Sequence, residues 1–322
     1  MPNTITEKLV GSAEKYRKQL LQLPAIGVSD ALIHMTPRPG VSHKETTGWM
    51  TGDFELRPYT GEKNAGKNIG LDARTIETFL GSCVEEFDPN ILRDTIYAQL
   101  YAKGGKIEDA EIHKGILMKI MKTLLKKLNK NLFSAVRKDS GTTTSDLFNG
   151  FDTITKKEIT AGNIAAAKGN YKEIEIVTAQ NAVDILKSVY RAASDELRNE
   201  ESKLFIPQTV YDAYCDDYQT TVGAAPYNKA FEKTFLEGSQ NMCELVPLVS
   251  KKGSDYFQLT TKDNMLYGYG NGVEKETVRV REGDNPFLLQ FVAAMFFGVE
   301  YEYIGEEKLL IAEQKAPVNT GA

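Results

Sequence analysis

The sequence predicts an α+β protein in which most helices precede most strands. Three observations support this prediction: a candidate hairpin around residues 48–74, a lysine-rich helical pattern over 107–137, and successive strand patterns from residue 244 onward. The 322 residues are 41% hydrophobic and 26% charged, a composition that can bury a core. A net charge of -5 argues against a protein that coats nucleic acid with its whole surface, so any contact with DNA must be local.

The first residues predict a short helix and then an extended arm. Apolar side chains recur at helical spacing over residues 7–23, and Pro37, Pro39 and Gly40 then disfavour a long regular element. The basic start and apolar run of a signal peptide are missing, so we expect synthesis in the cytoplasm. The most apolar run, residues 286–299, is shorter than the roughly 20 residues that span a bilayer. It predicts a buried strand, and no membrane partner is expected.

A hairpin with an exposed tip is predicted next. Apolar and charged residues alternate over 53–58 and again over 69–74, while the intervening residues 60–68 are rich in glycine, asparagine and lysine. An isolated two-stranded arm is at best marginally stable in water, so a partner is expected to complete it. The candidate contact residues are Trp49, Phe54, Leu56 and Tyr59. The alternative is that these side chains are scattered on the surface or buried within the monomer.

The strongest periodic signal covers residues 107–137 and predicts one long helix. Isoleucine and leucine recur every four residues from Ile112 to Leu132, with no internal proline. No carboxylate occurs between Ile112 and Lys138, so ion pairs within the helix cannot neutralise its polar face. The lysines of this candidate DNA-facing surface are Lys114, Lys119, Lys122, Lys126, Lys127 and Lys130. The alternatives are a solvated face neutralised by acids from elsewhere in the fold and a membrane-surface helix.

An aromatic-containing connector, SDLFNGFDTITKKEITAGN, follows this helix at residues 145–163. Leu147, Phe148 and Phe151 are its candidate packing anchors. Beyond it, the pattern predicts two strand–helix pairs, the second with Pro207 at the break, and then a run of strands.

No motif predicts a catalytic, cofactor or metal site. His34, His43 and His113 lie outside metal-ligand spacing from one another and from the three cysteines, which we interpret as reduced core residues. The glycines of GYGNG, residues 268–272, stand between two strand patterns, so they predict a hairpin turn and not a phosphate-binding loop. We therefore expect no cofactor and no enzymatic activity. The alternative is a soluble α+β enzyme whose dispersed site escapes motif analysis.

The order of these elements resembles the major capsid proteins of tailed bacteriophages, the Hong Kong ninety-seven type, a fold shared with encapsulins. The segment similar to the extended loop and its return is GDFELRPYTGEKNAGKNIGLDARTIETFLGSCVEEF, the one similar to the spine helix is IHKGILMKIMKTLLKKLNKNLFSAVRK, and the connector is SDLFNGFDTI. Three further segments resemble axial-domain and closing-strand segments: LFIPQTVYDAY, TTKDNMLYGYG and MFFGVEYEYIGEEKLL. The resemblance covers most of the chain and transfers no catalytic residue.

The resemblance implies a domain order. It comprises an N-terminal arm at 1–46, an extended loop hairpin at 47–90, a peripheral domain with the spine helix 107–137 at 91–175, an axial domain at 176–275, and closing strands of both domains with a flexible tail at 276–322. In this family the extended loop lies over a neighbouring subunit, which implies that the hairpin side chains are buried between copies.

The resemblance also implies a function and partners. It points to a structural head protein of a phage or prophage virion, made in the bacterial cytoplasm, whose hexamers and pentamers form an icosahedral shell around double-stranded DNA. The basic helix face would meet that DNA without reading its sequence. About 45 residues precede the hairpin, too few for a fused scaffolding domain, so a separate scaffold protein is expected, with a portal. An encapsulin-like nanocompartment that encloses a cargo enzyme is the alternative.

Overall fold

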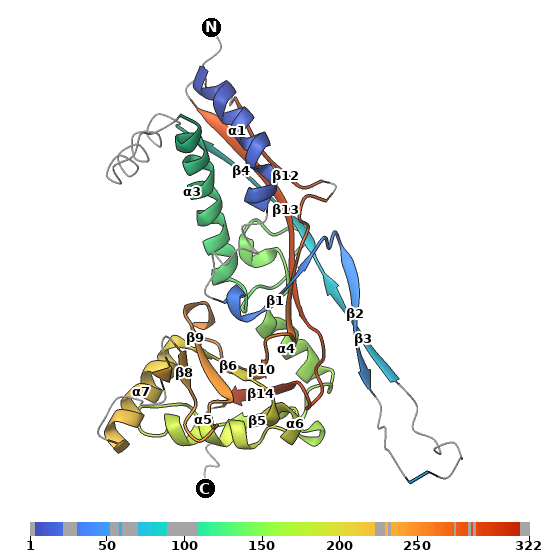
Figure 1. Cartoon of the computed structure of the whole chain (residues 1–322), viewed down its shortest axis with the longest axis vertical. Coiled ribbons are helices and arrows are strands. Elements are labelled where there is room, and N and C mark those ends of the chain that lie inside the picture. Colours follow the sequence, from blue (N-terminus) through green and yellow to red (C-terminus); the bar gives the residue numbers. More distant parts are fainter. Residues whose placement is uncertain are drawn as a thin grey trace.

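The computed structural model describes residues 4–21, 31–51, 58–59, 70–88, 109–222, 229–230, 233–273, 275–282, 285 and 288–315. An upright part contains α1, α3 and a long sheet, and a lower α/β part contains a second sheet with its helices (Figure 1). A two-stranded hairpin leaves the molecule near the level where these parts meet (Figure 1). The architecture confirms the α+β prediction.

The long sheet is built around β13, which pairs antiparallel with β4 on one side and with β11 and β12 on the other. The parallel strand β1 extends the sheet beyond β11. The strands are β1 (Thr36–Pro39), β4 (Phe79–Phe87), β11 (Met265–Tyr269), β12 (Thr277–Glu282) and β13 (Leu289–Tyr301). The predicted buried strand at 286–299 is confirmed from residue 289 onward, because β13 alternates buried and half-buried residues and then becomes almost fully buried.

Helices α1 (Thr4–Leu21) and α3 (Asp109–Lys130) pack on one face of this sheet. Ile116, Leu117 and Met121 of α3 are almost fully buried, and they join Val278 and Phe291 of the sheet in a continuous core. The apolar side of each predicted amphipathic helix is therefore the side that packs on the strands.

The predicted helix over 107–137 is too long at its end, because α3 ends at Lys130. The carbonyls of Leu132, Phe133 and Ala135 accept hydrogen bonds of 2.9–3.2 Å from the N–H groups of residues 150–152. These tertiary bonds replace the helical ones. Leu132 and Phe133 nevertheless remain in the core at 0% exposure, which is why the apolar period continues past the end of the helix.

The connector predicted to pack through Leu147, Phe148 and Phe151 does so. Phe148 and Phe151 are fully buried, and Leu147 is half-buried against the same core. Gly150 lies so close to the preceding turn that a Cβ would stand 2.3 Å from the carbonyl oxygen of Phe133. The connector therefore turns the chain back tightly into α4 (Phe151–Thr160).

The lower sheet has the strand order β5-β14-β10-β6-β9-β8-β7. Its strands are β5 (Tyr171–Ile174), β6 (Ser202–Pro207), β7 (Lys229–Ala230), β8 (Lys233–Phe235), β9 (Cys243–Leu248), β10 (Tyr256–Thr261) and β14 (Leu309–Gln314). Alternate residues face opposite sides, so Phe205 packs into the first core while Leu204 and Ile206 pack into a second one. The helices of this lower part are α5 (Ala182–Arg191), α6 (Asp195–Asn199) and α7 (Gln208–Val222).

Four short 3₁₀ turns complete the described elements. They are η2 (Leu32–His34), η3 (Thr144–Asp146), η4 (Ala166–Lys168) and η5 (Val249–Lys251).

The hairpin consists of β2 (Lys44–Thr51) and β3 (Gly70–Glu77) in antiparallel register, from Lys44 opposite Glu77 to Thr51 opposite Gly70. Residues 79–87 are not part of it but form β4 of the long sheet. The segment predicted as one extended loop, 47–90, therefore includes a strand of the body.

The predicted hairpin turn at GYGNG is wrong. The strands on either side of it, β11 and β12, both pair with β13 and not with each other. Gly268 instead lies within β11, directly opposite Gly298 of β13.

Candidate functional site

The two faces of the hairpin differ. One face carries cross-strand pairs that include Met50 with Leu71 and Gly48 with Ala73. All four of these residues are exposed, Met50 at 64% and Leu71 at 69%. Because residues alternate between the faces of a strand, Trp49 and Arg74 lie on the other face. The exposed face is thus apolar at its outer end, as is typical of a protein–protein interaction surface.

The second face contacts the body of the same chain through Trp49. Its ring stacks on Tyr303, with centroids 5.9 Å apart, and the Lys308 ammonium lies 4.9 Å from the centre of the indole ring. Trp49 is half-buried by these contacts. The alternative of burial within the monomer therefore applies to Trp49.

The other predicted hairpin residues have no described contact with the body of the chain. Tyr59 is 98% exposed. Phe54 and Leu56 lie outside the described residues. Met50 and Leu71, which the sequence analysis did not select, have the exposed apolar side chains on the described strands, and their opposition in the β2–β3 register is the signal that pairs them.

Arg74 links β3 to two other elements. Its Nη2 donates to Glu158 of α4 and to Glu300 of β13, each at 2.8 Å, and its Nε donates to the carbonyl of Tyr301 at 3.2 Å. The arginine side chain is 15% exposed and both carboxylates are largely buried. These are charge-assisted bonds in a site with limited access to water.

The two carboxylates respond differently to this environment. Burial raises the pKa of Glu300, although Arg74 opposes the shift. Burial also acts to raise the pKa of Glu158, but hydrogen bonds from Asn163 and Arg74 outweigh it, and the pKa of Glu158 is lowered. Glu158 is therefore the better anionic partner of Arg74 at mildly acidic pH.

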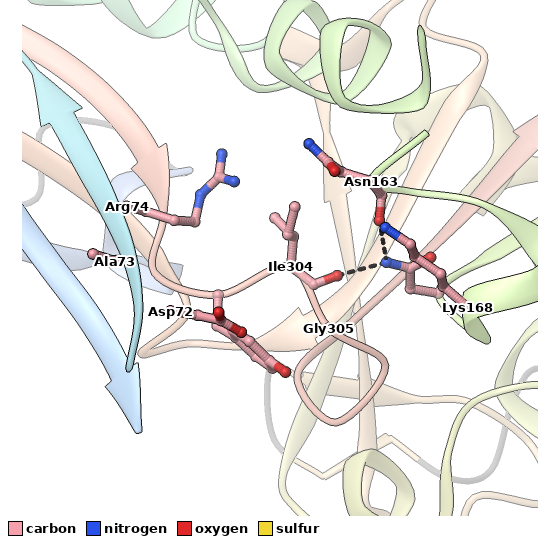
Figure 2. Close-up of a pocket in the computed structure, with 9 residues that line it drawn as sticks. Asp72, Ala73, Arg74, Asn163, Lys168, Ile304 and Gly305 are labelled. Carbon is pink, nitrogen blue, oxygen red and sulfur yellow. Dashed lines mark hydrogen bonds between the residues drawn. The ribbon is translucent and has the colours of Figure 1, made fainter. Parts of the chain in front are cut away.

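A cavity of about 420 Å³ lies beside these contacts. Figure 2 shows it between β3, which carries Asp72, Ala73 and Arg74, and the loop after α4, which carries Asn163 and Lys168. This loop is fixed by the side chain of the buried Asn170, which donates to the carbonyls of Asn163 and Ile304. The full lining is Asp72, Ala73, Arg74, Asn163, Lys168, Asn170, Tyr303, Ile304 and Gly305.

A basic surface covers the outward side of α3. With about 3.6 residues per turn, one set of lysines lies opposite the buried stripe of the helix. These exposed residues are Lys119, Lys122, Lys126, Lys127 and Lys130. Among the residues that the structure describes, no carboxylate forms an ion pair with any of them. The surface is therefore a patch of five exposed lysines that have no carboxylate partner in the described part of the chain.

Lys114 lies apart from this patch. It is half-buried, and its ammonium stands 4.8 Å from the ring centre of Tyr16 on α1. Lys114 therefore belongs to the packing of α1 against α3. The period of α3 alone does not reveal this contact, because Tyr16 lies on a different helix.

The described residues contain no group of three or more histidine, cysteine or acidic side chains that could hold a metal ion. None of the described helices is both long and apolar enough to cross a membrane. Of the cysteines, Cys243 is fully buried while Cys83 and Cys215 are half-buried, and all three are free thiols.

Comparison with known proteins gives a fold but no sequence relative. No protein-family profile matches the chain, and no curated protein sequence matches it significantly. Among solved structures, a chain of the satellite phage P4 procapsid that includes the size determination (Sid) protein aligns over 94% of this chain and 99% of its own length, with a TM-score of 0.57 and 12% identity. The capsid of a native GTA particle aligns over 89% and 90%, with a TM-score of 0.56 and 13% identity.

The chain has the Hong Kong ninety-seven capsid fold. The holo-SrpI encapsulin complex of Synechococcus elongatus shares this capsid fold with it, at a TM-score of 0.53 and 11% identity over 91% of this chain and 90% of the encapsulin chain. Among the residues that the structure describes, the basic surface of α3 and the exposed hairpin face are two exposed surfaces of distinct chemical character.

Proposed function

We propose that the chain is the major capsid protein of a tailed bacteriophage or prophage, a structural subunit that assembles with its own copies into an icosahedral shell around double-stranded DNA. The observation that carries this proposal is the capsid fold over nearly the whole chain, shared with a phage procapsid chain over 99% of that chain's length. A separate scaffold protein and a portal belong to the same proposal.

The exposed hairpin face supports self-assembly. Met50 and Leu71 expose 64% and 69% of their surface at the far end of the described strands. Burial of two such side chains against a neighbouring copy would contribute about 1.5–3 kcal/mol each. In this proposal the neighbour is a second subunit, and the hairpin is the arm that reaches it.

The basic surface of α3 supports the proposal that the shell encloses a polyanion, DNA. Five exposed lysines with no carboxylate partner among the described residues form a field that attracts phosphate regardless of base sequence.

The test is assembly of the purified chain, measured by light scattering and negative-stain electron microscopy. We expect closed particles of uniform size from the unmodified protein, alone or with its scaffold. The double variant Met50→Asp, Leu71→Asp should leave the chain folded but reduce particle yield at least tenfold, since two charges would have to be buried at the contact.

The matched control is Met50→Leu, Leu71→Met, which keeps both side chains apolar and should assemble normally. Assembly of the aspartate variant at the unmodified yield would contradict the role of the hairpin. A chain that stays monomeric with its scaffold at every concentration would contradict the shell function. Particles isolated from producing cells with a protein cargo and no DNA would support the nanocompartment instead.

A further inference from the structure

We infer that Arg74 and Lys308 form a two-point latch that sets the direction in which the hairpin leaves the body, and that opening this latch lets the hairpin turn about a fixed root. This inference concerns one chain alone and stands whether or not the chain forms a shell. It rests on three features: a rigid root, two cation-centred contacts further out, and a cavity between hairpin and body.

The root is where the end of β3 crosses the long sheet. Gly298 and Gly268 are paired across β13 and β11, and both lie directly against this crossing. A Cβ on Gly298 would stand 2.0 Å from the carbonyl oxygen of Glu77, and one on Gly268 would stand 2.7 Å from Cγ2 of Thr78. Only a pair of glycines allows the chain to pass this closely.

Burial and hydrogen bonds fix the root. Ile76 and Thr78 are 0% and 2% exposed, and Ile76 packs with Val41 and Leu266 in a small separate cluster. The N–H of Thr78 donates to the carbonyl of His43 at 2.7 Å. Residues 76–78 are therefore rigidly held, and any change in the direction of the hairpin must begin on its outer side, before residue 76 in β3.

The first latch point is Arg74, two residues outward from Ile76. Its partners Glu158 and Glu300 belong to α4 and β13, so one guanidinium joins the hairpin to two different elements of the body. Its Nε bond to the Tyr301 carbonyl fixes the plane of the guanidinium.

The second latch point is Lys308, which belongs to the body. Its ammonium donates to both carboxylate oxygens of Glu200, at 2.8 and 2.6 Å, and is only 9% exposed. The same ammonium lies 4.9 Å from the ring centre of Trp49 on β2. The hairpin is thus held at this point by a cation–π contact to an anchored lysine and by stacking on Tyr303.

Between the two points the hairpin does not pack tightly on the body. A solvent-accessible cavity of about 420 Å³ separates the hairpin from the body beside Asp72, Ala73 and Arg74. Beyond the latch, Met50 and Leu71 are exposed. Opening the latch would therefore uncover one half-buried indole and a few polar groups, and it would leave the hydrophobic cores intact.

The experiment measures the direction of the hairpin in the full chain. Spin labels are attached at Leu71→Cys on the hairpin and Val249→Cys on the body, both highly exposed positions, with Cys83 and Cys215 replaced by serine. The labelled chain is diluted into unlabelled chain, so that pulsed dipolar spectroscopy reports distances within one molecule. We expect a single narrow distance distribution, which broadens and shifts in Arg74→Met, Lys308→Met.

The control is Lys44→Met, which removes a hairpin cation whose partner, Glu77, lies on the hairpin itself, so the distribution should stay narrow. If the double methionine variant does not fold, the variant Glu158→Gln, Glu300→Gln takes its place. It keeps Arg74 but removes the two charges opposite it, and it should likewise broaden and shift the distance distribution. An unchanged narrow distribution in a folded latch variant would overturn the inference, and so would a broad distribution in the unmodified chain.

Discussion

Arg74 shows how one residue can depend on two carboxylates with opposite titration behaviour. The folded chain lowers the pKa of Glu158 through hydrogen bonds that outweigh its burial, and it raises the pKa of Glu300 through burial. A lowered pKa contributes stability above the unfolded value, near 4.5, and this contribution is lost as the pH falls through the folded pKa. A raised pKa contributes stability at low pH, which is lost as the pH rises through the folded pKa.

These opposite signs give a prediction for two single variants. The stability that the unmodified chain has over Glu158→Gln should shrink as the pH falls below about 4.5, because the favourable charge of Glu158 is neutralised. The stability that it has over Glu300→Gln should grow on acidification, because Glu300 takes up a proton more readily in the folded state. Urea unfolding at several pH values between 3 and 7 measures both differences. Parallel trends in the two variants would refute this account of Arg74.

At the scale of elements, α3 combines a correct sequence interpretation with a misplaced end. The apolar period and the lysine-rich polar face were both legible in the sequence, because a helix repeats its environment every three to four residues. The end of the helix at Lys130 could not be predicted from the sequence, because the hydrogen bonds that replace the helical ones come from residues 150–152. Lys114 was grouped with the exposed lysines for the same reason, since its partner Tyr16 lies on another helix.

The exposed lysines of α3 predict a salt-dependent affinity for duplex DNA. Replacing Lys119, Lys122 and Lys126 by glutamine should lower the slope of log affinity against log salt by up to about 3, since each phosphate contact contributes about 0.9. Fluorescence anisotropy with a short duplex of arbitrary sequence measures the slope. The matched control replaces three exposed lysines elsewhere, Lys156, Lys252 and Lys262, with the same change in net charge. Equal losses in both triple variants would mean that α3 has no special role.

The hairpin is a second element whose sequence signal was only partly informative. Strand alternation predicted paired strands at 53–58 and 69–74, and β3 confirms the second of them. The strand that pairs with β3 is β2 at residues 44–51, and most of the predicted first strand lies outside the described residues. The alternation also did not reveal that one face rests on the body through Trp49 and Arg74. The glycines that form the root were equally hidden. Gly298 occurs within a continuous apolar run, and only the crossing of residues 77–78 above it explains why no Cβ fits there.

For the whole molecule, one buried cation connects α4 to the lower sheet on the side of the first core. The side chain of Lys251 is 0% exposed, and its ammonium donates to Asp152 at 3.2 Å and to Gln258 at 2.6 Å. Asp152 lies in the first turn of α4, and Gln258 lies on β10 of the lower sheet, opposite Phe205 and therefore on the face that packs into the first core. Burial lowers the pKa of Lys251, while the charge of Asp152 opposes the shift. The ammonium also lies 4.2 Å from the ring centre of Phe133.

We predict that Lys251→Ala destabilises the chain by about 3–5 kcal/mol, because it leaves Asp152 without its cation in a largely buried site. The double variant Lys251→Met, Asp152→Leu should lose less than the single alanine variant, since no unpaired charge remains and the volume is kept. Urea unfolding monitored by circular dichroism compares the two. A double variant at least as unstable as the single one would show that the ion pair is not the source of the stability.

The sequence by itself determined the α+β class, the two amphipathic helices, the buried strand at 289–299 and the basic character of α3, because each depends on a period of two or about 3.6 residues within one segment. The order of these segments was enough to indicate a capsid fold. Only the tertiary structure decided where α3 ends, which residues of the hairpin are exposed, and how Arg74 and Lys308 hold its base. These features depend on contacts between different segments of the chain, from Ala135 with Gly150 to Arg74 with Glu300, and no local period records such a contact.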